Sequence, residues 1–408
     1  MSKKIHIGLI KEGKVPADSR VPLTPAQCRA ILDKYENVQI MVAPSPNRCY
    51  KDEEYLELGI PMSEDLSDCG ILMGVKEVPI KELVADKIYY FFSHTIKKQP
   101  YNRDLLLAML EKNIQMVDYE TLKNLKGGRI IGFGRYAGIV GAHNGVRAYG
   151  IKTGEFTLPA AHASKDFDEI KGIYQQTKFP AIKIVSTGNG RVATGARETL
   201  EAMGIREVSP KEYLEEAFDE AVFVHLRYED MYKNKETKKF DKSEFYTDPT
   251  DYYCDFEGYT KISEIFINGI YWDPRGPVYF TTADMRQPEF YIKVIADITC
   301  DIAPDSSVPC TLKATKITDD VFGYDRVNET AVAPYGENTV EVMSVDNLPN
   351  ELPRDASNSF GEMLMGDVLE EMFKEHSKVI ERATIAKNGK LTEHFEYLQD
   401  YVDGEGFG

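Results

Sequence analysis

AIKIVSTGNGRVATGA, residues 181–196, holds the clearest indication of how this chain folds. The segment begins as a Val- and Ile-rich run typical of a buried strand, passes through Gly188 and Gly190, and continues with a helical pattern as far as Gly204. A further short apolar segment, IREVS (205–209), completes a β-α-β unit. Glycines at the two turn positions allow a pyrophosphate to come close to the backbone N–H groups at the helix N-terminus. The segment therefore predicts a Rossmann domain that binds a dinucleotide.

The residues expected to hold this dinucleotide lie in the glycine turn and at the start of the helix. They are Gly188, Gly190, Arg191, Val192 and Ala193. A second match to the pattern G-x-G-x-x-G/A occurs upstream, within residues 128–138, but it follows a very short strand and has no clear strand directly after it. We therefore favour the downstream match, for which the alternative is a loop that needs glycine only for its backbone angles.

The choice between NAD and NADP depends on the strand that follows the helix. An NAD site usually has an Asp or Glu at the end of that strand, which accepts hydrogen bonds from the ribose hydroxyls, whereas an Arg accommodates the 2′-phosphate of NADP. Here the region contains Glu207, which suits NAD, and Arg206, which suits NADP. The sequence leaves both cofactors open.

Short apolar runs alternate with helical patterns through the first 120 residues as well. This alternation predicts a parallel sheet that is covered on both faces. The expected strands lie in the segments IHIGLI (5–10), VQIMVA (38–43), GILMGV (70–75), IYYFFS (88–93) and IQMVDY (114–119). A second series of strands and helices starts near residue 181. The chain is therefore expected to be an α/β protein with two Rossmann-like, doubly wound domains.

Two helical segments mark the expected joins between these domains. GRYAGIVGAHNGVRAYGIKTG (134–154) carries a stripe of Gly and Ala that lets a long helix pack closely against another element, and NSFGEMLMGDVLEEMFKEH (358–376) is amphipathic. We expect a discontinuous domain with the catalytic and substrate-binding groups and a dinucleotide-binding domain inserted into it. Their expected limits are 1–134 plus 336–408 for the first domain and 135–335 for the second.

Composition and charge restrict the partners. The chain has 408 residues with 49 Lys and Arg against 66 Asp and Glu, a formal net charge of −17, which repels phosphate backbones and anionic lipids. We expect a small-molecule substrate and no nucleic-acid or membrane partner, while a homo-oligomer is compatible with the sequence. No apolar run reaches the roughly 18 residues of a membrane helix, and the N-terminus enters a strand directly, so we expect a cytoplasmic location. The six cysteines form no CxxC pair, which favours free thiols and no metal site.

Charged residues follow three of the predicted N-terminal strands. Lys76 follows GILMGV, His94 follows IYYFFS with Lys97 three residues later, and Arg20 lies in the long loop after IHIGLI. Because the carboxyl ends of parallel strands meet at one edge of a sheet, these cations are expected to form one site. Taken one at a time, the histidine also suits a structural role, and each lysine suits a solvated surface.

If these residues face a ligand, their chemistry divides into binding and proton transfer. Arg20 has the planar fork that suits a substrate carboxylate, and Lys97 can bind a second carboxylate. Lys76 and His94 are then left as acid/base groups, because burial and neighbouring cations lower the pKa of a lysine and a histidine titrates near neutral pH. Together with a dinucleotide, such groups indicate hydride transfer at a carbon that bears nitrogen or oxygen beside a carboxylate.

Several motifs, distributed over nearly the whole chain, resemble those of a known enzyme family. They are DSRVPLTP (18–25), GVKEVP (74–79), FFSHTIKKQPYN (91–102), VDYE (117–120), GFGRYAGIVG (132–141), INGIYW (267–272), ADITCD (296–301) and SVDNLPNELPRDAS (344–357). The family is the saccharopine dehydrogenase (lysine-forming) and lysine-ketoglutarate reductase group, which is related to alanine dehydrogenases and to the soluble part of proton-translocating transhydrogenases. FFSHTIK and INGIYW are most similar to the reductase half of the bifunctional lysine-degrading enzyme.

The resemblance implies two Rossmann-like domains that are separated by a cleft and joined by long helices, and the reversible NAD(P)-linked oxidation of saccharopine to lysine and 2-oxoglutarate. It implies that Lys76 is the base that takes the proton from the secondary amine, and that His94 assists water addition and carbinolamine breakdown. Arg20 and Lys97 would bind the substrate. Asp346 matches an acidic residue near the nicotinamide, although a cap or turn residue is its alternative role.

Two other functions stay open on the sequence. Oxidative deamination of a small amino acid, as in alanine dehydrogenase, fits the same domain plan, but its substrate needs one carboxylate anchor, whereas Lys97 supplies a further cation. A nucleotide-binding regulatory module without turnover is the second alternative, and the presence of both Lys76 and His94 argues against it. The chain departs from the family in its TGNGRVATGA turn and in a polar insertion, residues 228–262, which we expect to be an exposed excursion.

Overall fold

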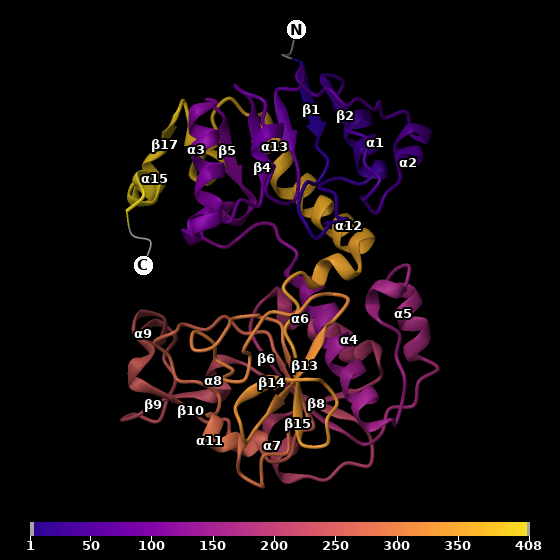
Figure 1. Cartoon of the computed structure of the whole chain (residues 1–408), viewed down its shortest axis with the longest axis vertical. Helices are drawn as coiled ribbons and strands as arrows, with labels where there is room; N and C mark the ends of the chain where they lie inside the picture. The colour runs from indigo at the N-terminus through magenta and orange to yellow at the C-terminus, as the bar shows by residue number, and fades with distance from the viewer. Residues whose placement is uncertain (1–3, 406–408) are drawn as a thin grey trace. The chain divides into compact units, whose positions relative to one another are not determined.

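The structure is a computed structural model that describes residues 4–405. It forms two compact units, one from the N-terminal residues as far as Phe133 together with the residues from Pro353 onward, and the other comprising Gly134–Leu352. Figure 1 shows that the indigo N-terminal strands and the yellow C-terminal segment occur in the same unit. The first unit is therefore discontinuous in sequence, and both units are α/β.

The first unit is built on a seven-stranded sheet in the order β17-β16-β5-β4-β3-β1-β2. Strands β1 to β5 are parallel and lie at the predicted positions. Their bounds are β1 Ile5–Leu9, β2 Val38–Val42, β3 Ile71–Met73, β4 Ile88–Phe91 and β5 Gln115–Asp118. The C-terminal segment adds an antiparallel edge, β16 (Thr384–Lys387) and β17 (Lys390–Leu391), which the sequence analysis does not predict.

Apolar side chains cover both faces of this sheet, as predicted. Along β4, Tyr89 and Phe91 enter one buried cluster and Tyr90 enters another, because successive side chains of a strand point to opposite faces. Helix α3 contributes to the first cluster, and α1 and α12 contribute to the second. The helices of this unit are α1 Pro25–Lys34, α2 Asp52–Glu57, α3 Arg103–Glu111, α12 Pro353–Met363, α13 Leu369–Phe373, α14 Lys378–Ala383 and α15 Gln399–Asp403.

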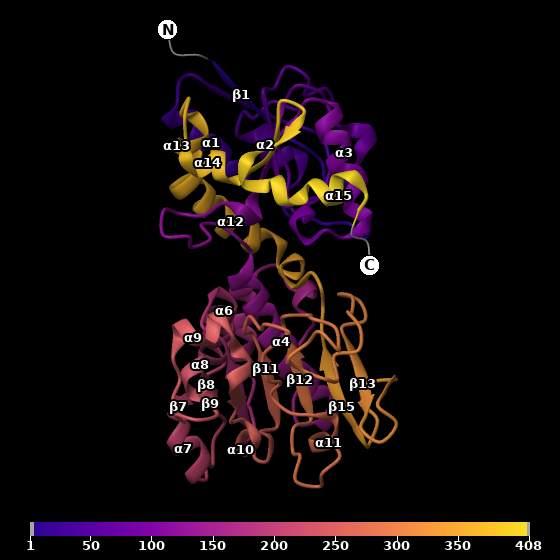
Figure 2. The same ribbon diagram turned by 90° about the vertical axis from the view of Figure 1, so that its left-hand side faces the viewer.

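The second unit is built on an eight-stranded sheet in the order β14-β13-β15-β12-β11-β6-β8-β7. Figure 2 shows β7 toward one side of this sheet and β13 toward the other. All its strands are parallel except β13 and β14, which form an antiparallel edge. The bounds are β6 Lys183–Thr187, β7 Arg206–Val208, β8 Val222–Leu226, β11 Ile265–Asn268, β12 Val294–Asp297, β13 Val321–Asp325, β14 Thr330–Val332 and β15 Thr339–Met343. Its longer helices are α4 Gly134–Thr153, α5 Phe167–Tyr174 and α6 Arg191–Ala202, with shorter turns at α7 Pro210–Glu215 and α11 Thr282–Met285.

The strand order departs from the chain order beside the glycine turn. Strand β6 pairs in parallel with β8 along its whole length, from Lys183 opposite Val222 to Thr187 opposite Leu226. Strand β7, which directly follows α6 in the chain, pairs with β8 and lies at the sheet edge. The longer and more apolar β8 therefore takes the buried place next to the glycine turn.

The glycine-rich helix α4 packs closely against α6. A Cβ atom at Gly138 would lie 1.9 Å from the carbonyl oxygen of Val192, and one at Gly195 would lie 1.9 Å from the carbonyl oxygen of Arg135. No side chain fits in either place, so the backbones of the two helices are in direct contact. This confirms the predicted role of the small-residue stripe in close packing.

The sequence predicts that the chain returns to the first unit near residue 336, but the structure places this return at Pro353. Strand β15 lies inside the second sheet, between β12 and β13. The short turn Leu348–Glu351 is then tied to α4 by a hydrogen bond of 2.8 Å from Asn144 Nδ2 to Glu351 Oε1. Residues 336–352 therefore belong to the second unit. The prediction is wrong because an apolar strand shows in sequence that it is buried but not which sheet it joins.

The insertion at residues 228–262 is a folded part of the second unit, contrary to the expected exposed excursion. It contains a two-stranded sheet of β9 (Tyr232–Asn234) and β10 (Tyr252–Cys254), with the helical turns α8 Tyr228–Met231, α9 Lys242–Thr247 and α10 Glu257–Thr260. Its aromatic side chains, among them Tyr232, Phe245 and Phe256, are buried in the main apolar cluster of the unit. The many charged residues between these aromatic positions hide the apolar face in sequence.

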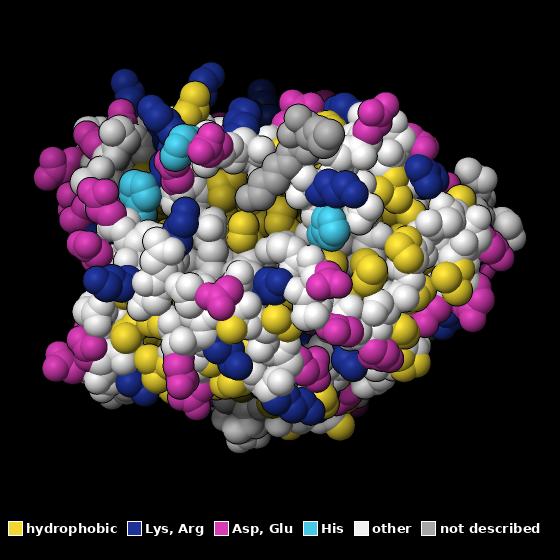
Figure 3. All heavy atoms as spheres, turned by 90° about the horizontal axis from the view of Figure 1, so that it is seen from above, with side chains coloured by type: hydrophobic (Ala, Val, Ile, Leu, Met, Phe, Trp, Pro, Cys, Tyr) yellow, Lys and Arg dark blue, Asp and Glu magenta, His cyan; other side chains and the backbone are white. Residues whose placement is uncertain are grey.

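The surface carries charges of both signs. On the face drawn in Figure 3, basic and acidic side chains are interspersed with apolar ones.

All six cysteines are free thiols. Within residues 4–405, none of the helices has the length and apolar character that crossing a bilayer requires.

Candidate active site

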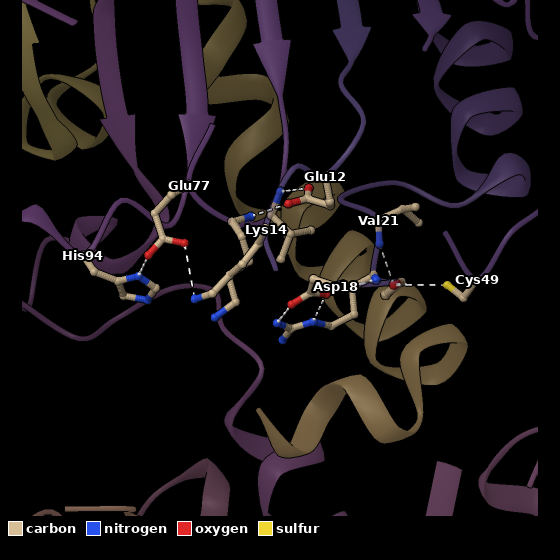
Figure 4. A network of polar contacts seen from close by, with 11 residues as sticks. Glu12, Lys14, Asp18, Val21, Cys49, Glu77 and His94 are labelled. Atoms are coloured by element: carbon tan, nitrogen blue, oxygen red, sulfur yellow. Dashed lines mark hydrogen bonds and ion pairs between the residues drawn. The ribbon is translucent and has the colours of Figure 1, made fainter. Parts of the chain in front are cut away.

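The predicted acid/base residues lie at the carboxyl-terminal edge of the first sheet. Lys76 follows β3, His94 follows β4, and Arg20 lies in the loop between β1 and α1. Figure 4 shows Lys14, Glu77 and His94 directed toward one another at this edge. The three predicted residues thus lie at one edge of the sheet, where the charges of Arg20 and Glu77 both act on Lys76, and their catalytic roles stay predictions.

Glu77 is the carboxylate that holds His94. His94 Nδ1 lies 2.7 Å from Glu77 Oε1, and Lys14 Nζ lies 3.5 Å from Glu77 Oε2. Burial raises the pKa of Glu77, but the hydrogen bond and charge of His94 lower it to about 2, so the carboxylate is ionised at neutral pH. An ionised acceptor places the proton on Nδ1 and leaves Nε2 for other chemistry. His94 also has a positive φ of 54°, an uncommon backbone conformation for histidine that is found at functional sites.

The Lys76 ammonium lies in an environment that favours its neutral form. Burial lowers the pKa of Lys76 to about 8, and the charges of Arg20 and Lys14 act in the same direction, while Asp18 and Glu77 oppose them. The segment that carries Lys76 is tied to Glu12, whose side-chain oxygens accept hydrogen bonds from the backbone N–H groups of Val75 at 2.6 Å and Lys76 at 2.9 Å. The neutral amine is therefore accessible to Lys76 near neutral pH, and its fraction grows as the pH rises toward 8.

Arg20 forms a buried ion pair within its own loop. Its Nε and Nη2 donate to the two carboxylate oxygens of Asp18 at 2.9 and 2.5 Å, and both side chains are almost fully buried. The guanidinium lies 4.2 Å from the centre of the Phe133 ring. A substrate carboxylate that used the whole fork of Arg20, as predicted from sequence, would therefore require Asp18 to move.

Two other predicted residues, Lys97 and Asp346, take no part in the contacts described above. Lys97 is exposed at the end of the turn Thr95–Lys97, where its backbone N–H donates to the His94 carbonyl. Asp346 is exposed in the second unit after β15, and its backbone N–H donates to the Thr315 carbonyl at 3.4 Å. Their predicted roles rest on sequence alone.

The glycine turn has the backbone that the dinucleotide prediction requires. Gly188 has a φ of +132°, and a Cβ atom there would lie 2.6 Å from the carbonyl oxygen of Gly269, so glycine is needed for both conformation and space. Gly190 caps α6, and a Cβ atom there would meet no protein atom within 4 Å. The turn therefore leaves open space at the N-terminus of α6, as a bound pyrophosphate needs.

This open space is part of a cavity of about 340 Å³. Its lining residues come from the glycine turn, one face of α6 and the end of β8: Gly188, Asn189, Gly190, Ala193, Thr194, Arg197, His225 and Arg227. Of the five predicted cofactor residues, Gly188, Gly190 and Ala193 line the cavity and Arg191 does not. Val192 packs instead against Gly134 and Gly269, because it lies on the face of α6 that meets α4.

Sequence reasoning missed several residues of both sites. Glu77 and Asp18 stand beside predicted residues in the motifs GVKEVP and DSRVPLTP, so their proximity was a visible signal. His225 and Arg227 gave no such signal, because their place depends on the order of the strands. Among residues 4–405, no group of three or more His, Cys, Asp or Glu side chains is arranged to hold a metal ion.

A search against protein-family models matches residues 8–140 to the N-terminal domain of alanine dehydrogenase and PNT. Among solved structures, an L-alanine dehydrogenase covers 98% of this chain with a TM-score of 0.64 at 16% identity, and 99% of that chain is covered. The transhydrogenase from Sinorhizobium meliloti covers 95% of this chain with a TM-score of 0.57 at 12% identity, and 100% of that chain is covered. These similarities establish that the chain has the alanine dehydrogenase type of fold.

Curated relatives match over most of this chain. Alpha-aminoadipic semialdehyde synthase is 29% identical in Arabidopsis thaliana over 96% of this chain, and the mitochondrial protein of Mus musculus is 28% identical over 98%. The matches cover 41% and 48% of those proteins, so the chain spans about half the length of these relatives or less. Saccharopine dehydrogenase [NAD(+), L-lysine-forming] of Emericella nidulans is 25% identical over 92% of this chain and 95% of its own length. The chain is thus a homologue of the saccharopine dehydrogenases and alpha-aminoadipic semialdehyde synthases.

Proposed function

We propose that the protein is an NAD(P)-dependent amino acid dehydrogenase that acts on a CH–NH group. Its proposed reaction is the reversible conversion of saccharopine, NAD(P)⁺ and water to lysine, 2-oxoglutarate and NAD(P)H. The observation that carries the proposal is a lysine whose pKa is lowered to about 8 at the same sheet edge as a histidine held by an ionised carboxylate, Glu77, whose charge also acts on the lysine. The names of the relatives support the choice of substrate.

Lys76 is the proposed base for the first proton transfer. In its neutral form it accepts the proton of the secondary amine that joins the two halves of saccharopine. The nicotinamide, when bound, accepts the hydride from the carbon next to this nitrogen. Lys76 suits the step because its surroundings lower its pKa into the range in which the amine can gain and lose a proton near neutral pH.

His94 is the proposed acid/base group for hydrolysis of the resulting C=N bond. Water adds to the carbon, and His94 Nε2 accepts a proton from the water and later returns it to the departing amine. The carbinolamine then breaks down to lysine and 2-oxoglutarate. Glu77 takes no proton in this scheme, because it holds Nδ1 of the ring and so keeps Nε2 available.

The glycine turn is the proposed site of the dinucleotide. Gly188 and Gly190 let the pyrophosphate reach the backbone N–H groups at the start of α6, where the partial positive charge of the helix favours an anion. The cavity beside the turn carries Arg197 and Arg227, whose charges favour a phosphorylated ligand over a neutral one.

The reaction is tested by absorbance at the nicotinamide band. The purified chain is mixed with NADH or NADPH and either lysine plus 2-oxoglutarate or pyruvate plus ammonia. We expect oxidation of the reduced cofactor with the first pair and little or none with the second. Turnover with pyruvate and ammonia alone would identify an alanine dehydrogenase instead, and tight cofactor binding without turnover of either pair would identify a regulatory module.

A further inference from the structure

The strand order of the second unit moves the position that selects between NAD and NADP. In a Rossmann domain, the residue that meets the adenosine ribose follows the strand next to the glycine-turn strand. That neighbour is usually the next strand in the chain, which here is β7. In this structure β8 lies beside β6 and β7 lies at the edge, so the selecting position follows β8.

The side chains at the end of β8 that face this cavity are an imidazole and a guanidinium, and neither is a carboxylate. His225 is the last residue but one of β8, and Arg227 directly follows the strand. Both residues line the cavity beside the glycine turn, together with Arg197 from α6. Among the residues that the structure describes, no Asp or Glu lines this cavity. A ribose 2′-hydroxyl therefore meets no carboxylate acceptor here, whereas a 2′-phosphate meets two guanidinium groups.

The two candidates that the sequence offered, Glu207 and Arg206, are each held in an ion pair. Glu207 on β7 accepts from Arg197 Nε at 3.1 Å and from Nη2 at 2.5 Å. Arg206 donates from Nε to Glu220 at 2.8 Å on the exposed edge of the sheet. Neither residue lines the cavity. Glu207 fixes one edge of the Arg197 guanidinium and so orients it.

Arg227 is the side chain best able to reach a ligand. Its side chain is 59% exposed, and its guanidinium Nη1 lies 4.0 Å from the carboxylate of Glu229. A guanidinium with five N–H donors and no close carboxylate partner can bind a phosphate through two parallel hydrogen bonds. His225 adds a further group, because its buried Nδ1 has no hydrogen-bond partner among the residues that the structure describes.

We propose that Arg227, with His225 and Arg197, binds the 2′-phosphate of NADP, so that the protein prefers NADP(H) to NAD(H). The inference rests on the proposed function in one respect, namely that the glycine turn binds a nicotinamide dinucleotide. It adds the identity of the dinucleotide and the residues that select it.

Equilibrium binding tests this inference without any amino acid substrate. Isothermal titration calorimetry of the whole chain is carried out with NADP⁺, NAD⁺, 2′,5′-ADP and 5′-ADP at one fixed salt concentration. We expect NADP⁺ to bind at least about tenfold more tightly than NAD⁺, and 2′,5′-ADP to exceed 5′-ADP by a similar factor, since the added phosphate forms charge-assisted hydrogen bonds.

Three variants locate the effect. Arg227→Ala should weaken NADP⁺ binding about tenfold or more and leave NAD⁺ binding nearly unchanged, and Arg227→Lys should restore part of the difference. Arg206→Ala is the matched control, because it removes the other arginine of this sheet edge and should leave the ratio of the two affinities unchanged. Both positions are exposed, so the three variants are expected to fold.

Two results would overturn the inference. Equal or tighter binding of NAD⁺ by the unchanged chain would do so while leaving the proposed amino acid oxidation intact, as would an Arg227→Ala variant that weakens both dinucleotides equally. Absence of binding by both dinucleotides would overturn this inference and the proposed function together.

Discussion

Lys76 is the residue on which the proposed chemistry depends most. Lys76→Met removes the amine but keeps a long apolar side chain, so we expect turnover to fall by about 10²- to 10⁴-fold, the usual contribution of a general base. Dinucleotide affinity should change little, because the proposed contacts of the dinucleotide come from the glycine turn and the start of α6. Steady-state kinetics and calorimetry on the same preparation measure both quantities.

The matched control is Lys81→Met, five residues further along the same segment. The Lys81 side chain is 83% exposed, so its loss should change neither quantity. Near-normal turnover of Lys76→Met would show that another group is the base.

The charges around Lys76 lead to two opposite shifts in pH dependence. Lys76 has to be neutral to accept a proton, and its pKa is lowered to about 8, so kcat/KM for amine oxidation should rise as the pH approaches 8 and level off above it. Glu77→Gln removes a negative charge that raises the pKa of Lys76, so the rise should move to lower pH. Lys14→Met removes a positive charge that lowers this pKa, so the rise should move to higher pH.

Profiles of kcat/KM against pH for the three proteins measure these shifts. Movement of both variants in one direction would contradict the assignment of the rise to Lys76.

The contact between α4 and α6 sets the geometry of the glycine turn. In Gly138→Ala the new methyl group would lie 1.9 Å from the carbonyl oxygen of Val192, and backbone atoms cannot give way as a flexible side chain can. We expect the free energy of unfolding to fall by about 3 kcal/mol, the upper range for an overpacked site. Urea denaturation followed by circular dichroism measures the change.

Gly172→Ala in α5 is the control for this substitution. Its Cβ atom would meet nothing within 4 Å, so the exchange should stabilise the protein by about 0.5–1 kcal/mol through helix propensity alone. Equal effects of the two substitutions would show that α4 and α6 are less closely packed than described.

The limits of the second unit can be tested with two fragments of the whole chain. Residues 134–352 contain β15 and the turn that Asn144 holds, whereas residues 135–335 lack both. We expect the longer fragment to unfold cooperatively and the shorter one to lose its fixed structure, because removal of β15 leaves β12 and β13 without their shared neighbour. Thermal unfolding followed by circular dichroism distinguishes them, and cooperative unfolding of both fragments would contradict the observed boundary.

Much of the first sheet and of its polar site follows from local pattern. Each parallel strand is a short apolar run that ends in polar residues, and this rule predicts Lys76, His94 and Arg20 at one edge of the sheet. The same rule did not show that Arg20 is paired with Asp18, because a loop residue's partner depends on how the loop closes on itself. It also missed β16 and β17, which follow β5 by more than 260 residues in the chain.

Local sequence determines where strands, helices and tight turns form, since backbone angles, side-chain periodicity and helix caps act over a few neighbouring residues. It therefore determined the glycine turn of this protein and the chemical character of each strand end. The neighbours of each strand were decided by long-range packing, in which the apolar β8 takes the buried place beside β6 and the short β7 is left at the edge. For that reason the arginine expected to select the cofactor is Arg227, which follows β8, and not a residue of β7, the strand that follows α6 in the chain.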